Sequence, residues 1–162
     1  MKKIKAIFAS MAMVIAVLAT TAMFTSCSDD DKNEPEAPAA TAVAGTYTGD
    51  MTCSVMGSES VFENLTVTIA STDDTTVSIT LSSFGEPPMQ VPGITITGVK
   101  VSGSENTYSI AESEFSGNTP TGTAYSGTAK GSVVDDNLTL NVQLQYGAMP
   151  MPLICTIKAP KK

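Results

Sequence analysis

The sequence contains no histidine, no arginine and no tryptophan. Without histidine, Ser-His-Asp and Cys-His catalytic arrangements are excluded, and the commonest zinc ligand is missing. Without arginine, no side chain can bind phosphate or carboxylate in bidentate geometry. Without tryptophan, a carbohydrate-binding surface that stacks sugars on indole rings is not expected. These absences argue against an enzyme, and we expect no catalytic residue, no metal and no cofactor.

Positive charge is also scarce. Nine lysines are the only basic residues, and Lys2, Lys3 and Lys5 lie at the extreme N-terminus. From residue 27 onward, six lysines stand against sixteen acids, which is a net charge of about −10. Nucleic acids and anionic lipid surfaces attract basic protein faces. We therefore expect no nucleic-acid partner.

Acidic residues occur in three pairs, Asp73/Asp74, Glu112/Glu114 and Asp135/Asp136. Glycoside hydrolysis needs two acids on opposite sides of a substrate cleft, whereas adjacent aspartates are typical of turns. The segment Asp135-Asp136-Asn137 is too short to be good evidence for a calcium loop. We interpret the pairs as structural.

The N-terminal 26 residues have the pattern of a signal peptide. The three lysines precede an apolar run over residues 7–18, which is shorter than the roughly 20 residues of a transmembrane helix. Phe24, Thr25 and Ser26 before Cys27 resemble a lipobox. That resemblance implies cleavage before Cys27 and attachment of lipid, palmitate included, to this cysteine. The alternative is an ordinary secretory signal with an incidental cysteine.

The residues after Cys27 suggest where the protein is sent. They resemble the export signal of surface-displayed lipoproteins of the Bacteroidota, which implies anchoring in the outer membrane, facing the cell exterior. The alternative is a solvated acidic patch. Residues 27–44 are rich in Asp, Glu, Pro and Ala, and we predict that they form the lipidated cysteine and a flexible tether. The export-signal residues are Ser28, Asp29, Asp30 and Asp31.

From residue 45 to 160 the sequence alternates between apolar and polar residues, which is typical of half-buried strands. Eight strands are predicted, the fifth short, with a bulge at Gly98. Closing the sheet removes its exposed edges, so we predict an all-β, eight-stranded antiparallel up-and-down barrel. The residues expected to face inward are Tyr47, Met51, Cys53, Val55, Val61, Leu65, Val67, Ile69, Val77, Ile79, Leu81, Ile94, Ile96, Val99, Val101, Tyr108, Ile110, Tyr125, Ala129, Val133, Leu138, Leu140, Val142, Leu144, Tyr146, Met151, Leu153, Cys155 and Ile157.

Two further cysteines test the closure. Cys53 lies on the first predicted strand and Cys155 on the last, both at inward positions. An exported protein occupies a compartment that permits disulfides, and a closed barrel places these strands side by side. We predict a disulfide between them. The alternative is two buried thiols that do not meet.

The segments AGTYTGDMTCSVMG (residues 44–57) and GTAYSGTAKGSVVDDNLTLNVQL (residues 122–144) resemble the calycin-like β-barrel domain of Bacteroidota lipoproteins. The resemblance covers most of residues 43–158, implies a lipocalin-like barrel and brings no catalytic residue. Gly45-Thr46-Tyr47 also resembles the Gly-x-Trp motif that plugs the lipocalin barrel floor. Lys158 would then cover the ring in place of the usual arginine. The alternative is that Tyr47 is simply a core residue.

Methionine is abundant for a chain of this size. Flexible thioethers suit irregular apolar pockets, and two Pro-rich segments, PPMQ (residues 87–90) and YGAMPMP (residues 146–152), are predicted to rim a barrel mouth. The alternative is that these methionines only fill gaps or lie exposed in loops. The candidate ligand-lining residues are Tyr47, Met51, Met56, Met89, Met149 and Met151.

Together these features predict a surface-exposed lipoprotein that is not an enzyme. Its barrel would bind a small apolar or amphipathic ligand, since an eight-stranded barrel can hold one small molecule, or a protein of the cell envelope. The alternative is a structural or adhesive surface protein whose barrel is solid and binds no small molecule.

Overall fold

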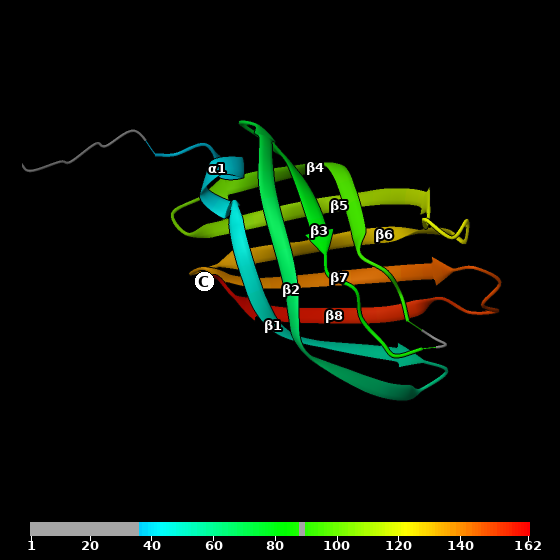
Figure 1. Ribbon diagram of the computed structural model, residues 1–162. Helices are drawn as coiled ribbons and strands as arrows, with labels where there is room; N and C mark the ends of the chain where they lie inside the picture. The colour runs from blue at the N-terminus through cyan, green and yellow to red at the C-terminus, as the bar shows by residue number, and fades with distance from the viewer. Residues whose placement is uncertain (1–35, 88–89) are drawn as a thin grey trace, which may run out of the picture. The chain divides into compact units, whose positions relative to one another are not determined.

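The computed structural model describes residues 36–87 and 90–162. Its eight strands form a closed barrel in which each strand pairs antiparallel with the next, and β1 pairs with β8 (Figure 1). The predicted eight-stranded up-and-down barrel is confirmed. The elements are α1 (Ala39–Val43), β1 (Gly45–Val55), β2 (Ser58–Asp73), β3 (Thr76–Leu81), β4 (Ile94–Ser104), β5 (Thr107–Asn118), β6 (Ala124–Val134), β7 (Asn137–Tyr146) and β8 (Leu153–Pro160).

The barrel core follows from the period-two pattern. On β7, for example, Leu138 and Leu140 face inward and are buried, whereas Asn141, which follows Leu140 and points to the other face of the strand, is exposed. Because side chains alternate between the two faces of a strand, each strand contributes apolar groups to the inside and polar groups to solvent. Removing the inward groups from water is the main favourable contribution to folding.

Bulges in β4 and β2 change which residues of these strands face inward. The predicted one is present at Gly98, whose φ is +73°, and Ile96 and Val99 on either side of it are both buried. The second, at Asn64 with φ +57°, was not predicted. It turns the Phe62 side chain toward the core and leaves Val61 61% exposed. The expectation that Val61 faces inward is therefore wrong.

Two strand boundaries also differ from the prediction. The fifth strand is not short: β5 continues to Asn118 and buries Phe115 after a register shift between Ile110 and Ser113. The last strand begins at Leu153, and Met151, expected to be its first inward residue, precedes it and is 44% exposed. The Pro-rich sequence around Met151 explains the later start, since proline cannot donate a ladder hydrogen bond.

The helix α1 lies in the segment predicted to be tether. Its Ala40 and Val43 are buried against the barrel, and the Ala40 amide donates to the Asp74 carbonyl at 3.2 Å. The expectation that the tether extends to residue 44 is therefore wrong for Ala39–Val43, because these small and apolar residues form a helix that covers one end of the core. No helix within residues 36–87 and 90–162 is long and apolar enough to cross a membrane.

The barrel has two different ends (Figure 1). At one end lie α1, the C-terminal residues and the tight β2–β3, β4–β5 and β6–β7 turns. At the other end lie the β1–β2 turn and the longer connections after β3, β5 and β7. We call these the closed end and the open end.

A disulfide joins the first strand to the last. Cys53 of β1 and Cys155 of β8 are register partners, with a Cα–Cα distance of 4.0 Å and an S–S bond of 2.03 Å. Both residues are buried. The bond therefore crosses the seam at which the barrel closes.

Candidate ligand-binding cavity

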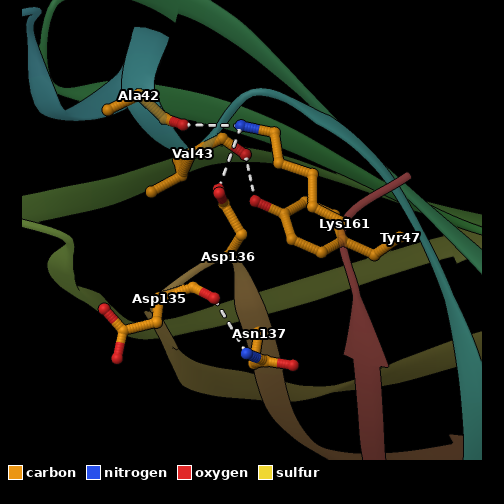
Figure 2. Close-up of polar contacts among 7 residues, drawn as sticks. All are labelled: Ala42, Val43, Tyr47, Asp135, Asp136, Asn137 and Lys161. Atoms are coloured by element: carbon orange, nitrogen blue, oxygen red, sulfur yellow. Dashed lines mark hydrogen bonds and ion pairs between the residues drawn. The ribbon is translucent and has the colours of Figure 1, made fainter.

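The closed end is sealed by contacts around Tyr47 (Figure 2). The ring is fully buried, and its hydroxyl donates to the Val43 carbonyl at 2.7 Å. The Lys161 ammonium donates to the Ala42 carbonyl at 2.9 Å and lies 3.6 Å from the Asp136 carboxylate. Burial, together with the negative charge of Asp136, raises the pKa of Tyr47 to about 12. Tyr47 therefore holds α1 over this end as a neutral hydrogen-bond donor.

Lys161, not Lys158, lies beside the plug residue. Tyr47 and Lys161 form a backbone bridge, and the Lys161 side chain passes next to the ring in Figure 2. Lys158 is exposed on β8 and pairs in register with Asp50. The expected covering role of Lys158 is therefore corrected to Lys161. The sequence did not distinguish the two lysines, because Lys158 lies near the end of β8 and Lys161 directly follows that strand.

The turn Asp135–Asn137 is structural. Asn137 Nδ2 donates to the Asp135 carbonyl at 2.8 Å, and Asp136 pairs with Lys161 (Figure 2). Among the described residues, no group of three or more His, Cys, Asp or Glu side chains is placed to hold a metal ion.

The open end contains a cavity of about 410 Å³. Strands β1, β2, β7 and β8 contribute its walls, and the segments between β3 and β4, between β5 and β6, and between β7 and β8 form its rim. Of the two predicted Pro-rich segments, residues 146–152 contribute to this lining, through Tyr146, Gly147, Ala148 and Met149. Its lining residues are Cys53, Val55, Ser58, Ser60, Phe62, Phe84, Gly85, Val91, Thr123, Tyr146, Gly147, Ala148, Met149 and Leu153.

The cavity lining carries no charged side chain. Its polar side-chain groups are the hydroxyls of Ser58, Ser60, Thr123 and Tyr146, and the rest is largely aliphatic, aromatic or sulfur. An ionised group placed there would lose its hydration without gaining a partner of opposite charge. The cavity is therefore suited to an uncharged apolar group, with hydroxyls to receive one polar function.

Phe84 forms one wall of the cavity. Its amide donates to the Val91 carbonyl at 3.0 Å, and the Val91 amide donates back at 2.9 Å. Its ring packs edge-to-face on Phe62, with ring centroids 5.5 Å apart. Phe84 is only 8% exposed. Backbone and ring contacts together fix this side chain between the cavity and the barrel core.

Beneath the cavity the barrel is filled. The next space toward the closed end measures about 10 Å³, which is at the lower limit for a single water molecule. Side chains of β1, β3, β4, β5, β7 and β8 surround it, including Met51, Ile96 and Phe115. Open space for a ligand is therefore at the mouth and not along the barrel axis.

The structure separates the candidate ligand-lining residues. Met149 lines the cavity, and Met51 lines the small inner space. Tyr47 is at the closed end, and Met56 and Met151 are 80% and 44% exposed and are absent from the cavity lining. Met89, Cys27 and residues 28–31 lie outside the described residues.

Sequence reasoning missed the aromatic wall. Phe84 follows a predicted strand and precedes Gly85-Glu86-Pro87, so the period-two pattern does not place it in the barrel interior. Phe62 was missed because the bulge at Asn64 reverses the alternation. An apolar aromatic residue immediately before a turn was the one available signal for Phe84.

The closed, eight-stranded antiparallel barrel is of the calycin-like class. The chain belongs to the calycin-like β-barrel domain family, whose profile matches residues 43–157. The structure is similar to that of a "putative outer membrane protein" from Bacteroides fragilis NCTC 9343, with a TM-score of 0.67 and 26% sequence identity. The match covers 77% of this chain and 53% of the other, so this chain spans about half of that protein. No curated protein is significantly similar in sequence.

Proposed function

We propose that this protein is a non-catalytic lipoprotein of the cell envelope whose barrel binds a small uncharged apolar or amphipathic molecule at its open end. The observation that carries the proposal is the cavity of about 410 Å³ lined without charge. Small-molecule sites typically measure about 300–1,000 Å³, with mostly apolar walls and a few polar groups that orient the ligand. The cavity meets each of these conditions.

The same lining argues against catalysis. General acid–base chemistry needs a group whose pKa lies near the working pH, and the cavity offers hydroxyls and a disulfide-bonded cysteine. These groups can orient a ligand, but none of them is suited to transfer its protons. The proposal is therefore binding without turnover.

Binding is tested with an uncharged fluorescent probe, N-phenylnaphthylamine, and by native mass spectrometry of protein purified from its own cells. We expect probe fluorescence to rise on binding and a co-purifying small molecule to be released on unfolding. Ser60→Trp, which places an indole in the cavity, should abolish probe binding. Glu59→Trp, on the opposite face of the same strand, should leave it unchanged. Equal binding by both variants would refute the proposed site.

An envelope location is supported by two independent observations. The sequence before and after Cys27 has the lipobox and acidic pattern of exported lipoproteins, and the structural relative carries an outer-membrane description. We propose that Cys27 is lipidated and that Ser28, Asp29, Asp30 and Asp31 direct export to the exterior face. Residues up to Ala39 then separate the lipid from the barrel.

Anchoring and export have separate tests. Cys27→Ser should eliminate incorporation of labelled palmitate and release the protein from the membrane fraction. Replacing Asp29, Asp30 and Asp31 together by Ala should preserve palmitate labelling but protect the protein from protease added to intact cells. Retained labelling in the Cys27 variant, or unchanged surface digestion in the triple variant, would contradict the respective assignment.

One observation favours the alternative of a structural or adhesive protein. The barrel is solid beneath Phe84, and Val61 and Ile154 are 61% and 53% exposed on its outer surface. The mouth cavity distinguishes the two: an adhesive protein with a solid barrel should bind no probe. Absence of both probe binding and a co-purifying molecule would therefore favour this second function.

A further inference from the structure

Two groups separate the mouth cavity from the inner space. Phe84 lines both of them, and the disulfide lines both with one cysteine each: Cys53 borders the mouth cavity and Cys155 borders the inner space. Among the described residues that line either space, Phe84 alone borders both. The floor of the cavity is thus an aromatic ring beside a sulfur bridge.

This floor is fixed rather than loosely packed. The two hydrogen bonds to Val91 hold the Phe84 backbone, and Phe62 packs against the ring. The space on the other side is apolar and too small for a ligand, with Ile94, Ile96 and Phe115 among its lining residues. A linear apolar molecule that enters from the mouth would stop at Phe84.

We propose that Phe84 is the residue that sets ligand length, so that this protein selects short uncharged apolar chains. This inference rests on the proposed function, because it concerns the same cavity. Each methylene that a ligand buries multiplies its affinity by about four. Affinity should therefore rise with chain length until the chain reaches Phe84, and additional methylenes should then add nothing.

The experiment measures displacement of N-phenylnaphthylamine from the purified full-length protein by straight-chain primary alcohols from butanol to dodecanol. In wild type, affinity should rise along the series and reach a plateau. Phe84→Ala joins the mouth cavity to the inner space and should move the plateau to longer chains, with a gain of about fourfold for each additional methylene accommodated.

Phe115→Ala is the matched control. Phe115 lines only the inner space, and like Phe84 it is 8% exposed. The same truncation there enlarges the inner space by a similar amount but leaves Phe84 in place. The plateau should therefore stay at the wild-type chain length. A shift in Phe115→Ala as large as that in Phe84→Ala would overturn the role of Phe84.

Two further outcomes separate this inference from the proposed function. Wild type that binds alcohols with a plateau that Phe84→Ala does not move retains the function and refutes Phe84 as the floor. Binding of alcohols by Phe84→Ala but not by wild type would refute ligand binding by the natural protein while supporting Phe84 as the barrier. If Phe84→Ala does not fold, as judged by circular dichroism, Phe84→Leu should move the plateau by a smaller amount in the same direction. A plateau that Phe84→Leu leaves at the wild-type chain length would overturn the inference.

Discussion

At the closed end, one tyrosine hydroxyl connects the barrel to the helix that covers it. The Tyr47 ring is fully buried and its hydroxyl reaches the Val43 carbonyl at 2.7 Å. Position 47 is where the sequence resembles the plug motif of lipocalins, with tyrosine in place of tryptophan. Tyrosine has a donor at the end of its ring, and here that donor is satisfied by the last residue of α1.

Tyr47→Phe tests this contact. The variant keeps the ring and leaves the Val43 carbonyl without its donor, so the free energy of unfolding should fall by about 1–3 kcal/mol. Urea denaturation followed by circular dichroism measures the change. Tyr125→Phe is the control, because Tyr125 is only half-buried; it should change stability little. Equal effects of the two substitutions would contradict the account of the closed end.

The raised pKa of Tyr47 predicts a stability change in alkali. The group has an ordinary pKa of 10.0 and a folded-state pKa of about 12. Between these values the folded state retains a proton that the unfolded state has lost, so stability falls as pH rises from about 10 toward 12. Wild type should lose more unfolding free energy over this range than Tyr47→Phe, in parallel urea titrations. Identical losses would show that Tyr47 ionises freely in the folded protein.

At the scale of single elements, β2 depends on an unusual residue conformation. Asn64 adopts φ +57°, and its backbone N–H donates to Asp50 Oδ1 at 3.4 Å. The register between β1 and β2 shifts at this point, between Gly49 and Met51. This bulge brings Phe62 to the inside, where it packs on Phe84. The cavity wall therefore depends on the backbone conformation at Asn64.

Substitutions at Asn64 separate conformation from side chain. Asn64→Gly should leave the unfolding free energy within about 0.5 kcal/mol of wild type, because glycine adopts positive φ without strain. Asn64→Val should lower it by about 1–2 kcal/mol, because a β-branched residue is strained there. Thermal and urea unfolding measure both. Indistinguishable stabilities for the two variants would exclude the bulge as a source of strain.

At the scale of the whole molecule, the barrel is closed by the pairing of β1 with β8 and by the disulfide between them. Cys53 and Cys155 are 102 residues apart in sequence. Linking such distant positions restricts the unfolded chain strongly, and the chain-entropy account gives up to about 4.7 kcal/mol for a loop of about 100 residues.

The double variant Cys53→Ala/Cys155→Ala tests this contribution. We expect its unfolding free energy to be lower than wild type by about 2–5 kcal/mol, measured in urea without reductant. Addition of reductant should lower the stability of wild type toward that of the variant and leave the variant unchanged. Labelling of two thiols per chain in unfolded, unreduced protein, apart from Cys27, would show that the bond does not form.

The strand pattern could be predicted because apolar alternation marks the faces of β strands directly. Leu138, Leu140 and Val142 show this on β7, and the glycine at position 98 marked its bulge in the sequence. Asn64 did not mark its bulge in the sequence, because an asparagine can also occupy a regular polar position of a strand. The positive φ at this position is required by the fold. The cavity lining could not be predicted from the sequence. It brings together Phe62, Phe84 and Tyr146 from separate parts of the chain, and their convergence depends on the strand register.

The same limit applies to the methionines. The abundance of methionine predicted that thioethers line the cavity, yet of the described methionines Met149 alone lines the mouth cavity. Met56 lies at a turn and Met151 precedes β8, where side chains face solvent. Residue type indicated the chemistry of a binding surface, but the placement of the connections at the open end determined which residues contribute to it.

The most direct test of the account is an NMR titration of isotope-labelled protein with N-phenylnaphthylamine. If the open end is the binding site, amide shifts should concentrate at Ser60, Tyr146 and Met149, while those of Tyr47 and Lys161 remain at their starting positions. Saturable shifts at the closed end, or no saturable shift anywhere, would contradict the claim that this barrel holds its ligand in the mouth.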